Sequence, residues 1–173
     1  YRDYKMAQNL EFLTRLHPDK KIIVWAQNAH IKKYRLRMSY ELDETAPTYT
    51  IALYCYSGEG DFTFGQGFDG THPDSMVYQF KTPEDPLSIA QILHKSDHDI
   101  TFLDLENQVR TPNNSWIFDV AKIHDWDGSS LEEVENIRNV WDGLILVNEA
   151  TTPTYIEFDY NYLEIPKKGY NKR

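Results

Sequence analysis

The residues around His30 are the part of this sequence best suited to proton-transfer chemistry. His30 follows an apolar run at residues 20–26, and the amides of Gln27 and Asn28 lie between the run and the histidine. Because an imidazole changes charge near neutral pH, it can act as a general acid or base, and neighbouring amides can orient it or bind an oxyanion. A structural histidine held by hydrogen bonds fits the same residues equally well, so the local pattern leaves both interpretations open.

Arg2 and Asp3 stand at the head of the first predicted helix and are expected to reach the same place. The helix is predicted over residues 3–16, and Asp3 is placed to cap it. Apolar residues recur there at spacings of three and four, at Met6, Leu10, Leu13 and Leu16. Because the helix and the apolar run are consecutive, the Arg2 guanidinium could lie near the end of that run.

Residues 21–27 are predicted to form the buried central strand of a sheet, since the run is continuously apolar and rich in β-branched side chains. A helix followed by such a strand is typical of α/β proteins with parallel sheets, in which ligands bind at the carboxyl ends of the strands. We therefore predict a single α/β domain of three layers, with helices on both faces of a mostly parallel sheet. Arg2, Asn28 and His30 should line one polar pocket at the strand ends.

The rest of the chain supplies further predicted elements but no repeat and no linker. Residues 58–60 are predicted to turn, residues 65–75 to form a loop, and residues 107–130 to be largely irregular. The tail after residue 152 turns basic and is expected to be loose. Strands are predicted at residues 49–56, 77–80, 100–105 and 143–147, and helices at residues 87–95 and 131–140.

Composition limits the possible partners. The 173 residues carry 18 Lys and Arg against 27 Asp and Glu, a net charge of −9, so a nucleic-acid-binding surface is not expected. The one basic cluster, at residues 32–37, is interpreted as a solvated face. No apolar stretch approaches the roughly 18 residues of a membrane span. A single cysteine, Cys55, cannot form an internal disulfide and is expected to be a buried structural thiol.

Several catalytic patterns are absent from the sequence. It has no glycine-rich phosphate loop, no paired cysteines for zinc, no His-Glu-x-x-His helix and no Gly-x-Ser-x-Gly elbow. His94 and His98 are four residues apart, but Ser96 and Asp97 indicate a helix end there, so a cap or surface role is favoured over a metal site. His30 therefore stays the leading candidate for chemistry.

Four blocks of the sequence resemble the erythromycin esterase family, whose members are also described as succinoglycan-biosynthesis-like proteins. Arg2-Asp3-Tyr-Lys-Met-Ala-Gln-Asn resembles the family's Arg-Asp-x-x-Met-Ala-x-Asn, and Trp25-Ala-Gln-Asn-Ala-His30 resembles a strand that ends Trp-Ala-His-Asn-x-His. Gly58-Glu59-Gly-Asp-Phe is similar to a Gly-Glu-Gly-x-Phe turn. Trp141-Asp-Gly-Leu-Ile, with Thr152-Pro153, is similar to a block near the family's C-terminus. The blocks cover residues 1–153 in the family's order.

The resemblance implies a metal-independent bacterial hydrolase without a cofactor, in which a histidine activates water to open an ester or a macrolide lactone. It points to His30 as a catalytic residue, and to Arg2, Asp3, Gln27, Asn28 and Glu59 as residues that bind or orient the substrate. It leaves the compartment, cytoplasmic or exported, open. It also implies that the chain is the C-terminal portion of a larger domain. The expected partners are a small-molecule ester or lactone and the missing N-terminal half of the same protein.

Two departures from the family pattern bear on activity. The family's proposed base and a neighbouring glutamate belong to the N-terminal half, so this chain alone is expected to be inactive. The first histidine of Trp-Ala-His-Asn-x-His is Gln27 here, and a glutamine side chain cannot take up a proton at neutral pH. A binding protein that holds the ligand without hydrolysing it is therefore the alternative to an esterase.

Overall fold

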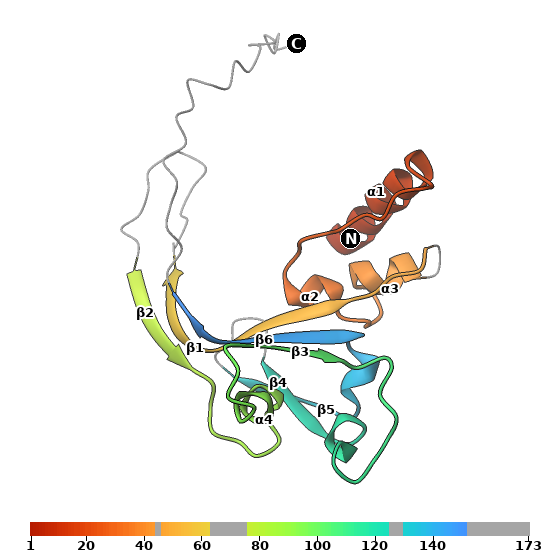
Figure 1. Cartoon of the computed structure of the whole chain (residues 1–173). Helices are drawn as coiled ribbons and strands as arrows, with labels where there is room; N and C mark the ends of the chain where they lie inside the picture. The colour runs from red at the N-terminus through yellow and green to blue at the C-terminus, as the bar shows by residue number, and fades with distance from the viewer. Residues whose placement is uncertain (44–45, 63–75, 125–129, 152–173) are drawn as a thin grey trace.

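A four-stranded mixed sheet organises the chain in the computed structural model, which describes residues 1–43, 46–62, 76–124 and 130–151 (Figure 1). Its strand order is β2-β1-β6-β3, formed by Met76–Lys81, Ile51–Phe62, Gly143–Ala150 and Ile100–Asp104. Strands β1 and β6 are parallel, whereas β1 with β2 and β3 with β6 are antiparallel. The predicted α/β class is confirmed. The prediction of a mostly parallel sheet is wrong, because β2 follows β1 in the chain and pairs with it antiparallel, as consecutive strands can without a crossover helix.

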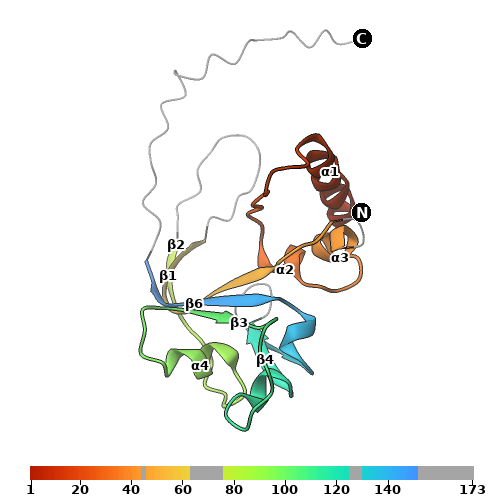
Figure 2. The ribbon, with the colours of Figure 1, turned by 45° about the vertical axis from the view of Figure 1, so that its right-hand side comes forward.

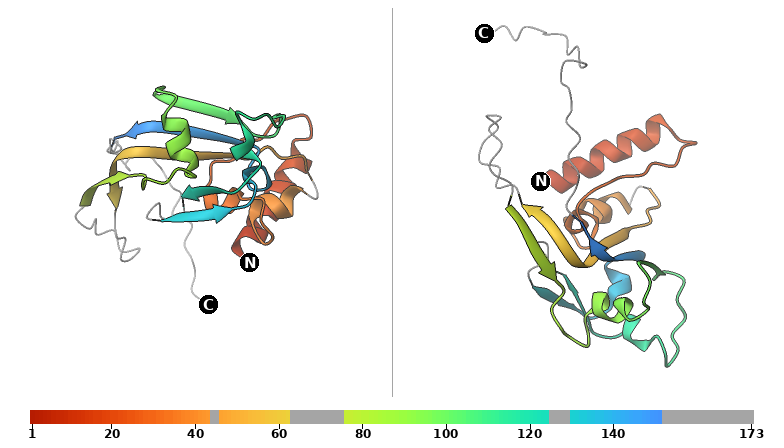
Figure 3. Two further views of the ribbon diagram at one scale, coloured as in Figure 1. Left: turned by 90° about the horizontal axis from the view of Figure 1, so that it is seen from below. Right: turned by 60° about the vertical axis from the view of Figure 1, so that its left-hand side comes forward.

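One face of the sheet carries the main hydrophobic core. Alternate residues of the two central strands point into it, and β1 contributes Ala52, Tyr54 and Tyr56. Helix α4 (Ile89–His94) and the hairpin of β4 (Ala121–His124) and β5 (Leu131–Val134) cover this face (Figure 3). The hydroxyl of Ser88 caps α4 by accepting a hydrogen bond from the Gln91 amide at 3.4 Å. The layer under the sheet is therefore a helix and a hairpin together.

Three helices lie on the other side of the sheet, near one end of it (Figures 1 and 2). They are α1 (Arg2–Leu16), α2 (Asn28–Ile31) and α3 (Met38–Asp43), and the first confirms the predicted helix 3–16. Helices α1 and α3 pack through a small second cluster of Ala7, Met38 and Leu42. Helix α1 thus brings its first residues, Arg2 and Asp3, to the side of α2.

Residues 21–27 do not form the predicted central strand. They run extended from α1 to α2 and pair with no strand among the described residues. The side chains of Ile23 and Trp25 are 94% and 87% exposed. The apolar run favoured a buried strand, but burial needs neighbours on both sides, and the rest of the described chain supplies none.

The structure also tests several smaller predictions. The predicted helix 131–140 is wrong, because residues 131–134 pair with β4 as strand β5 and only a 3₁₀ turn, Ile137–Asn139, follows. The predicted turn at 58–60 lies inside β1, where Gly58 has φ +141° and approaches the backbone of Ala150 closely. Ser115–Ile117 and β4 give regular structure to the segment expected to be irregular. Strands near 49–56, 77–80, 100–105 and 143–147 and the helix near 87–95 are confirmed.

The predicted loop 65–75 and the tail after residue 152 lie outside the described residues. In the part that is described, no helix combines the length and the apolar character needed to cross a bilayer.

Candidate functional site

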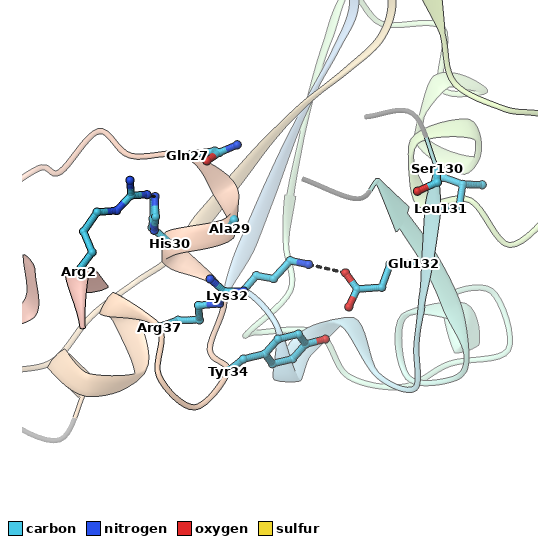
Figure 4. Close-up of a pocket in the computed structure, with 10 residues that line it drawn as sticks. All are labelled: Arg2, Gln27, Ala29, His30, Lys32, Tyr34, Arg37, Ser130, Leu131 and Glu132. Atoms are coloured by element: carbon cyan, nitrogen blue, oxygen red, sulfur yellow. Dashed lines mark hydrogen bonds and ion pairs between the residues drawn. The ribbon is translucent and has the colours of Figure 1, made fainter. Parts of the chain in front are cut away.

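A polar pocket of about 490 Å³ opens beside α2 (Figure 4). One wall comes from the start of α1 and from α2, and the opposite wall comes from the start of β5. The segment after α2 joins the two walls. The lining residues are Arg2, Gln27, Ala29, His30, Lys32, Tyr34, Arg37, Ser130, Leu131 and Glu132.

Asp3, His30 and Arg2 form a contiguous chain of polar side chains along the first wall. His30 Nδ1 lies 2.7 Å from Asp3 Oδ1, and the Arg2 guanidinium contacts His30 Nε2. The Asp3 and His30 side chains are 8% and 12% exposed, so both are largely shielded from water. The ring nitrogen and the carboxylate are close without a well-aligned hydrogen bond, so their attraction is mainly electrostatic. The structure thus brings Arg2 and His30 together as predicted, and Asp3, which the resemblance gave as an orienting residue, joins them. The prediction that Asp3 caps the helix is wrong, because Tyr1 is the N-cap and Asp3 lies within the first turn.

The Arg2 contact fixes the proton arrangement of His30. A guanidinium has only donors and stays protonated in proteins, so Nε2 of His30 must be the acceptor. The ring proton of the neutral imidazole then sits on Nδ1, the nitrogen that lies 2.7 Å from the Asp3 carboxylate. This tautomer leaves the basic lone pair of Nε2 on the side of Arg2, in the wall of the pocket. The arrangement can accept a proton at Nε2 and stabilise the resulting imidazolium through Asp3.

Arg37 places a second guanidinium beside the same aspartate. Its Nη1 lies 3.7 Å from Asp3 Oδ2, and its side chain is 44% exposed. The Asp3 carboxylate therefore lies beside both His30 and Arg37, while Arg2 contacts no carboxylate among the described residues. Two guanidiniums against one carboxylate give this end of the pocket a net positive charge, which suits a developing oxyanion or a carboxylate product.

Lys32 and Glu132 form the opposite end of the pocket, and sequence reasoning missed them. The Lys32 side chain is only 10% exposed and donates to Glu132 Oε2, so an ion pair joins the segment after α2 to β5 (Figure 4). The Lys32 ammonium also lies 5.6 Å from the ring centre of Tyr34 and 5.9 Å from that of Trp141. Burial and, to a lesser extent, the Glu132 charge raise the pKa of Tyr34, which stays a neutral donor at physiological pH. The interpretation of residues 32–37 as a solvated face is wrong for Lys32, because its side chain is buried against Glu132. Nothing local in the sequence identifies this partner, which lies 100 residues away.

Of the remaining predicted site residues, only Gln27 lines the pocket. The Asn28 amide instead donates to the Leu53 carbonyl at 2.7 Å and accepts from the Leu53 amide at 3.1 Å, which ties α2 to the edge of β1. Glu59 is exposed on β1 and accepts a hydrogen bond from Gln79 at 2.6 Å, away from the pocket lining. The predicted pocket of Arg2, Asn28 and His30 thus exists without Asn28. It also lies beside α2 and the start of β5, and not at the carboxyl ends of the strands.

The Trp-Asp-Gly block has a structural role in this chain. Asp142 is buried, accepts hydrogen bonds from the Thr50 amide at 2.7 Å and the Thr50 hydroxyl at 3.0 Å, and pairs with Lys33. Gly143 leaves room for the Phe102 ring, which would lie 3.0 Å from an added Cβ. This block therefore fixes the start of β6 against the residue before β1 and against the segment after α2.

No group of three or more His, Cys, Asp or Glu side chains within the described ranges is arranged to hold a metal ion. The pocket lining offers an imidazole (His30), a carboxylate (Glu132), an ammonium (Lys32) and a phenol (Tyr34) as groups that can exchange a proton.

Comparison with known proteins places this chain in a family. The erythromycin esterase family model matches residues 1–149. The Bacillus subtilis (strain 168) protein YbfO, named as a candidate hydrolase, is 26% identical over 170 residues, which cover 90% of this chain and 36% of that protein.

Two solved structures share the fold at low identity. A succinoglycan biosynthesis protein superposes with a TM-score of 0.61 at 17% identity, over 84% of this chain and 38% of its own. A Bacillus cereus protein superposes with a TM-score of 0.60 at 20% identity, over 86% of this chain and 38% of its own. The chain spans little more than a third of the length of each of these relatives. Since the family model covers most of its residues, this chain belongs to the erythromycin esterase family.

Proposed function

We propose that this chain supplies one wall of a metal-independent hydrolase site that cleaves carboxylic esters or lactones, macrolides among them, with water activated by histidine. The observation that supports the proposal best is that Arg2 and His30 line the pocket in contact with each other, with Asp3 beside His30 behind them. Family membership and the relative named as a candidate hydrolase support the reaction class. In the complete domain we also expect the three-layer arrangement predicted from the sequence.

Each side chain of the cluster has a proposed part in the reaction. The base of the remaining half takes the proton from the attacking water, and His30 exchanges a proton with the leaving oxygen at Nε2, supported by Asp3 beside Nδ1. Arg2 moves from the imidazole to the carbonyl oxygen, where charge develops as water attacks. The carbon–oxygen bond of the ester then breaks and yields a carboxylate and an alcohol.

The proposed partner is the remainder of the domain, because the resemblance assigns the family's water-activating base to a half that has no counterpart here. Half of a cleft also leaves its polar wall in water, where hydrogen bonds to an oxyanion are weak. We therefore expect the 173-residue chain alone to hydrolyse esters no faster than the uncatalysed background.

A chimaera provides the test. Residues 1–149 replace the matching segment of the Bacillus subtilis relative, and hydrolysis of a p-nitrophenyl ester and of a macrolide lactone is followed. The proposal expects His30→Ala to lower kcat/KM by roughly a hundred- to ten-thousand-fold, the usual contribution of an acid–base group. His98→Ala, which removes an exposed histidine outside the pocket lining, is the matched control and should leave kcat/KM unchanged. An active chimaera that is indifferent to His30→Ala would refute the role of His30.

The second candidate function is a binding protein, and Gln27 is the observation that favours it. This amide lines the pocket where the family pattern has a histidine. A chimaera that binds a macrolide but does not hydrolyse it, and that gains hydrolysis with Gln27→His, would support this alternative. A modest effect of Gln27→His on an already active enzyme would support the hydrolase.

A further inference from the structure

The face of the sheet opposite the core carries an uncovered apolar surface. Two cross-strand rows run over β1, β6 and β3, since pairing aligns Leu53 with Ile145 and Phe102, and Cys55 with Val147 and Ile100. The side chains of Ile100 and Phe102 are 64% and 54% exposed. We call these six residues the open face. None of its side chains is charged, so its exposure to water is unfavourable and it is a candidate interaction surface.

The extended segment 21–26 is a second uncovered apolar element. Its residues make no hydrogen bond within the part of the chain that the structure describes, although their backbone is extended as in a strand. Exposure alternates along it, because Ile22 and Val24 are 36% and 40% exposed against 94% and 87% for Ile23 and Trp25. This is the pattern of a strand with one side partly covered and neither edge paired.

The two elements meet at one place. The segment leads into Asn28, whose amide is held by both backbone groups of Leu53 on β1. Strand β2 pairs only with residues 57–62 of β1, so the β1 edge beside Leu53 has no neighbouring strand among the described residues. Leu53 thus belongs both to this free edge and to the open face, and the segment ends at the edge through Asn28. The segment lies on the side of the sheet that α4 does not cover (Figure 1).

We propose that this surface docks the remainder of an erythromycin-esterase domain, which adds a strand along residues 21–26 and lays apolar side chains on the open face. The inference rests on the proposed function, in which the same remainder completes the catalytic site. Nearly two-thirds of the Bacillus subtilis relative has no counterpart in this chain, which is ample material for a layer of this size. A second copy of this chain fits less well, because each copy carries a net charge of −9 and would repel the other. Strand addition also supplies the hydrogen bonds that an extended apolar segment lacks.

Cys55 and Trp25 are built-in reporters for the two parts of the surface. Cys55 is the only cysteine and belongs to the open face, and Trp25 lies in the extended segment. Burial raises the pKa of the Cys55 thiol, so labelling is run at about pH 9 to keep enough thiolate present.

The test mixes the 173-residue chain with the part of the Bacillus subtilis relative that has no counterpart in it, produced as a separate chain. Docking predicts that labelling of Cys55 slows at least tenfold and that Trp25 emission shifts to the blue, an assignment checked with Trp25→Phe. Phe102→Asp should abolish both effects. Val109→Asp should abolish neither, since it introduces the same charge at a 78% exposed residue outside the open face. Thermal unfolding checks that both variants fold.

Unchanged labelling and emission at about 100 μM of the added chain would overturn the proposal. Protection that grows with the concentration of this chain alone would overturn it in favour of self-association. None of these measurements involves substrate, and His30→Ala should dock as the parent chain does. A docked pair that fails to hydrolyse esters would therefore refute the hydrolase while leaving the docking surface in place.

Discussion

The Lys32–Glu132 pair yields an asymmetric prediction about stability. Its ammonium is almost buried, with the Lys32 side chain 10% exposed, whereas the Glu132 side chain is 38% exposed. Glu132→Gln leaves a buried cation without its counter-charge. Lys32→Met leaves a carboxylate that water can reach, and it fills the space beside Tyr34 and Trp141 with an unbranched apolar chain. We therefore expect the two variants to differ although they break the same ion pair.

The size of the difference follows from burial. Removing one partner of a fully buried pair costs about 3–5 kcal/mol, whereas an apolar replacement of similar volume is often neutral. Because Glu132 is partly solvated, we expect Glu132→Gln to lower the free energy of unfolding by roughly half of that, about 1.5–2.5 kcal/mol. Lys32→Met should change it by less than about 1 kcal/mol. The double variant should be more stable than Glu132→Gln alone, because it no longer buries an uncompensated charge.

Denaturant unfolding followed by tryptophan fluorescence measures these differences, since Trp141 is fully buried beside the pair. The slope of the unfolding free energy against denaturant concentration should be equal in the parent, the two single variants and the double variant. Equal slopes would show that all four unfold between comparable folded and unfolded states. Lys32→Met as damaging as Glu132→Gln would refute the reasoning, and so would a double variant no more stable than Glu132→Gln.

Three further predictions concern the sheet and the segments that hold it. Asp142→Ala should destabilise by about 3–5 kcal/mol in the same unfolding assay, because it leaves two buried donors of Thr50 unpaired, and a loss under 1 kcal/mol would contradict this. Hydrogen bonds from Asn107 and Tyr49 lower the pKa of Asp104, so its contribution to stability is present above the unfolded-state pKa and is lost as pH falls through the lowered folded value. Asp104→Asn should therefore flatten the acid limb of the stability curve measured by thermal melts, and Asp104 would have no such role if the parent curve were unchanged. Gly58→Ala should lower the free energy of unfolding by more than about 1 kcal/mol, since Gly58 has φ +141° and an added Cβ would lie 2.1 Å from the Ala150 carbonyl oxygen. Unchanged stability of this variant would contradict the prediction and show that the strand can shift.

The sequence by itself determined the elements whose signal is local. Helix 3–16 and the strands near 49–56, 100–105 and 143–147 were predictable, because each carries a local apolar pattern of its own. Burial did not follow that pattern everywhere, since Leu16 of α1 and Ile100 and Phe102 of β3 stay exposed. The proximity of Arg2 and His30 was also predicted, from residue type and from the order of helix, apolar run and histidine, although the buried strand assumed between them does not form. Recognition of the family depended on the same blocks.

Only the tertiary structure decided what depends on distant neighbours. Whether residues 21–27 are a buried strand depends on strands that lie beside them, and the described chain places none there. Residues 131–134 became β5 because β4 was available to pair with them, which outweighed a helical spacing. Lys32 pairs with Glu132, and Asp142 binds Thr50 and Lys33, across about 100 residues of sequence. Such pairings leave no periodic pattern in the sequence, because the residue type alone does not show whether a charged side chain is surrounded by water or paired with a distant residue.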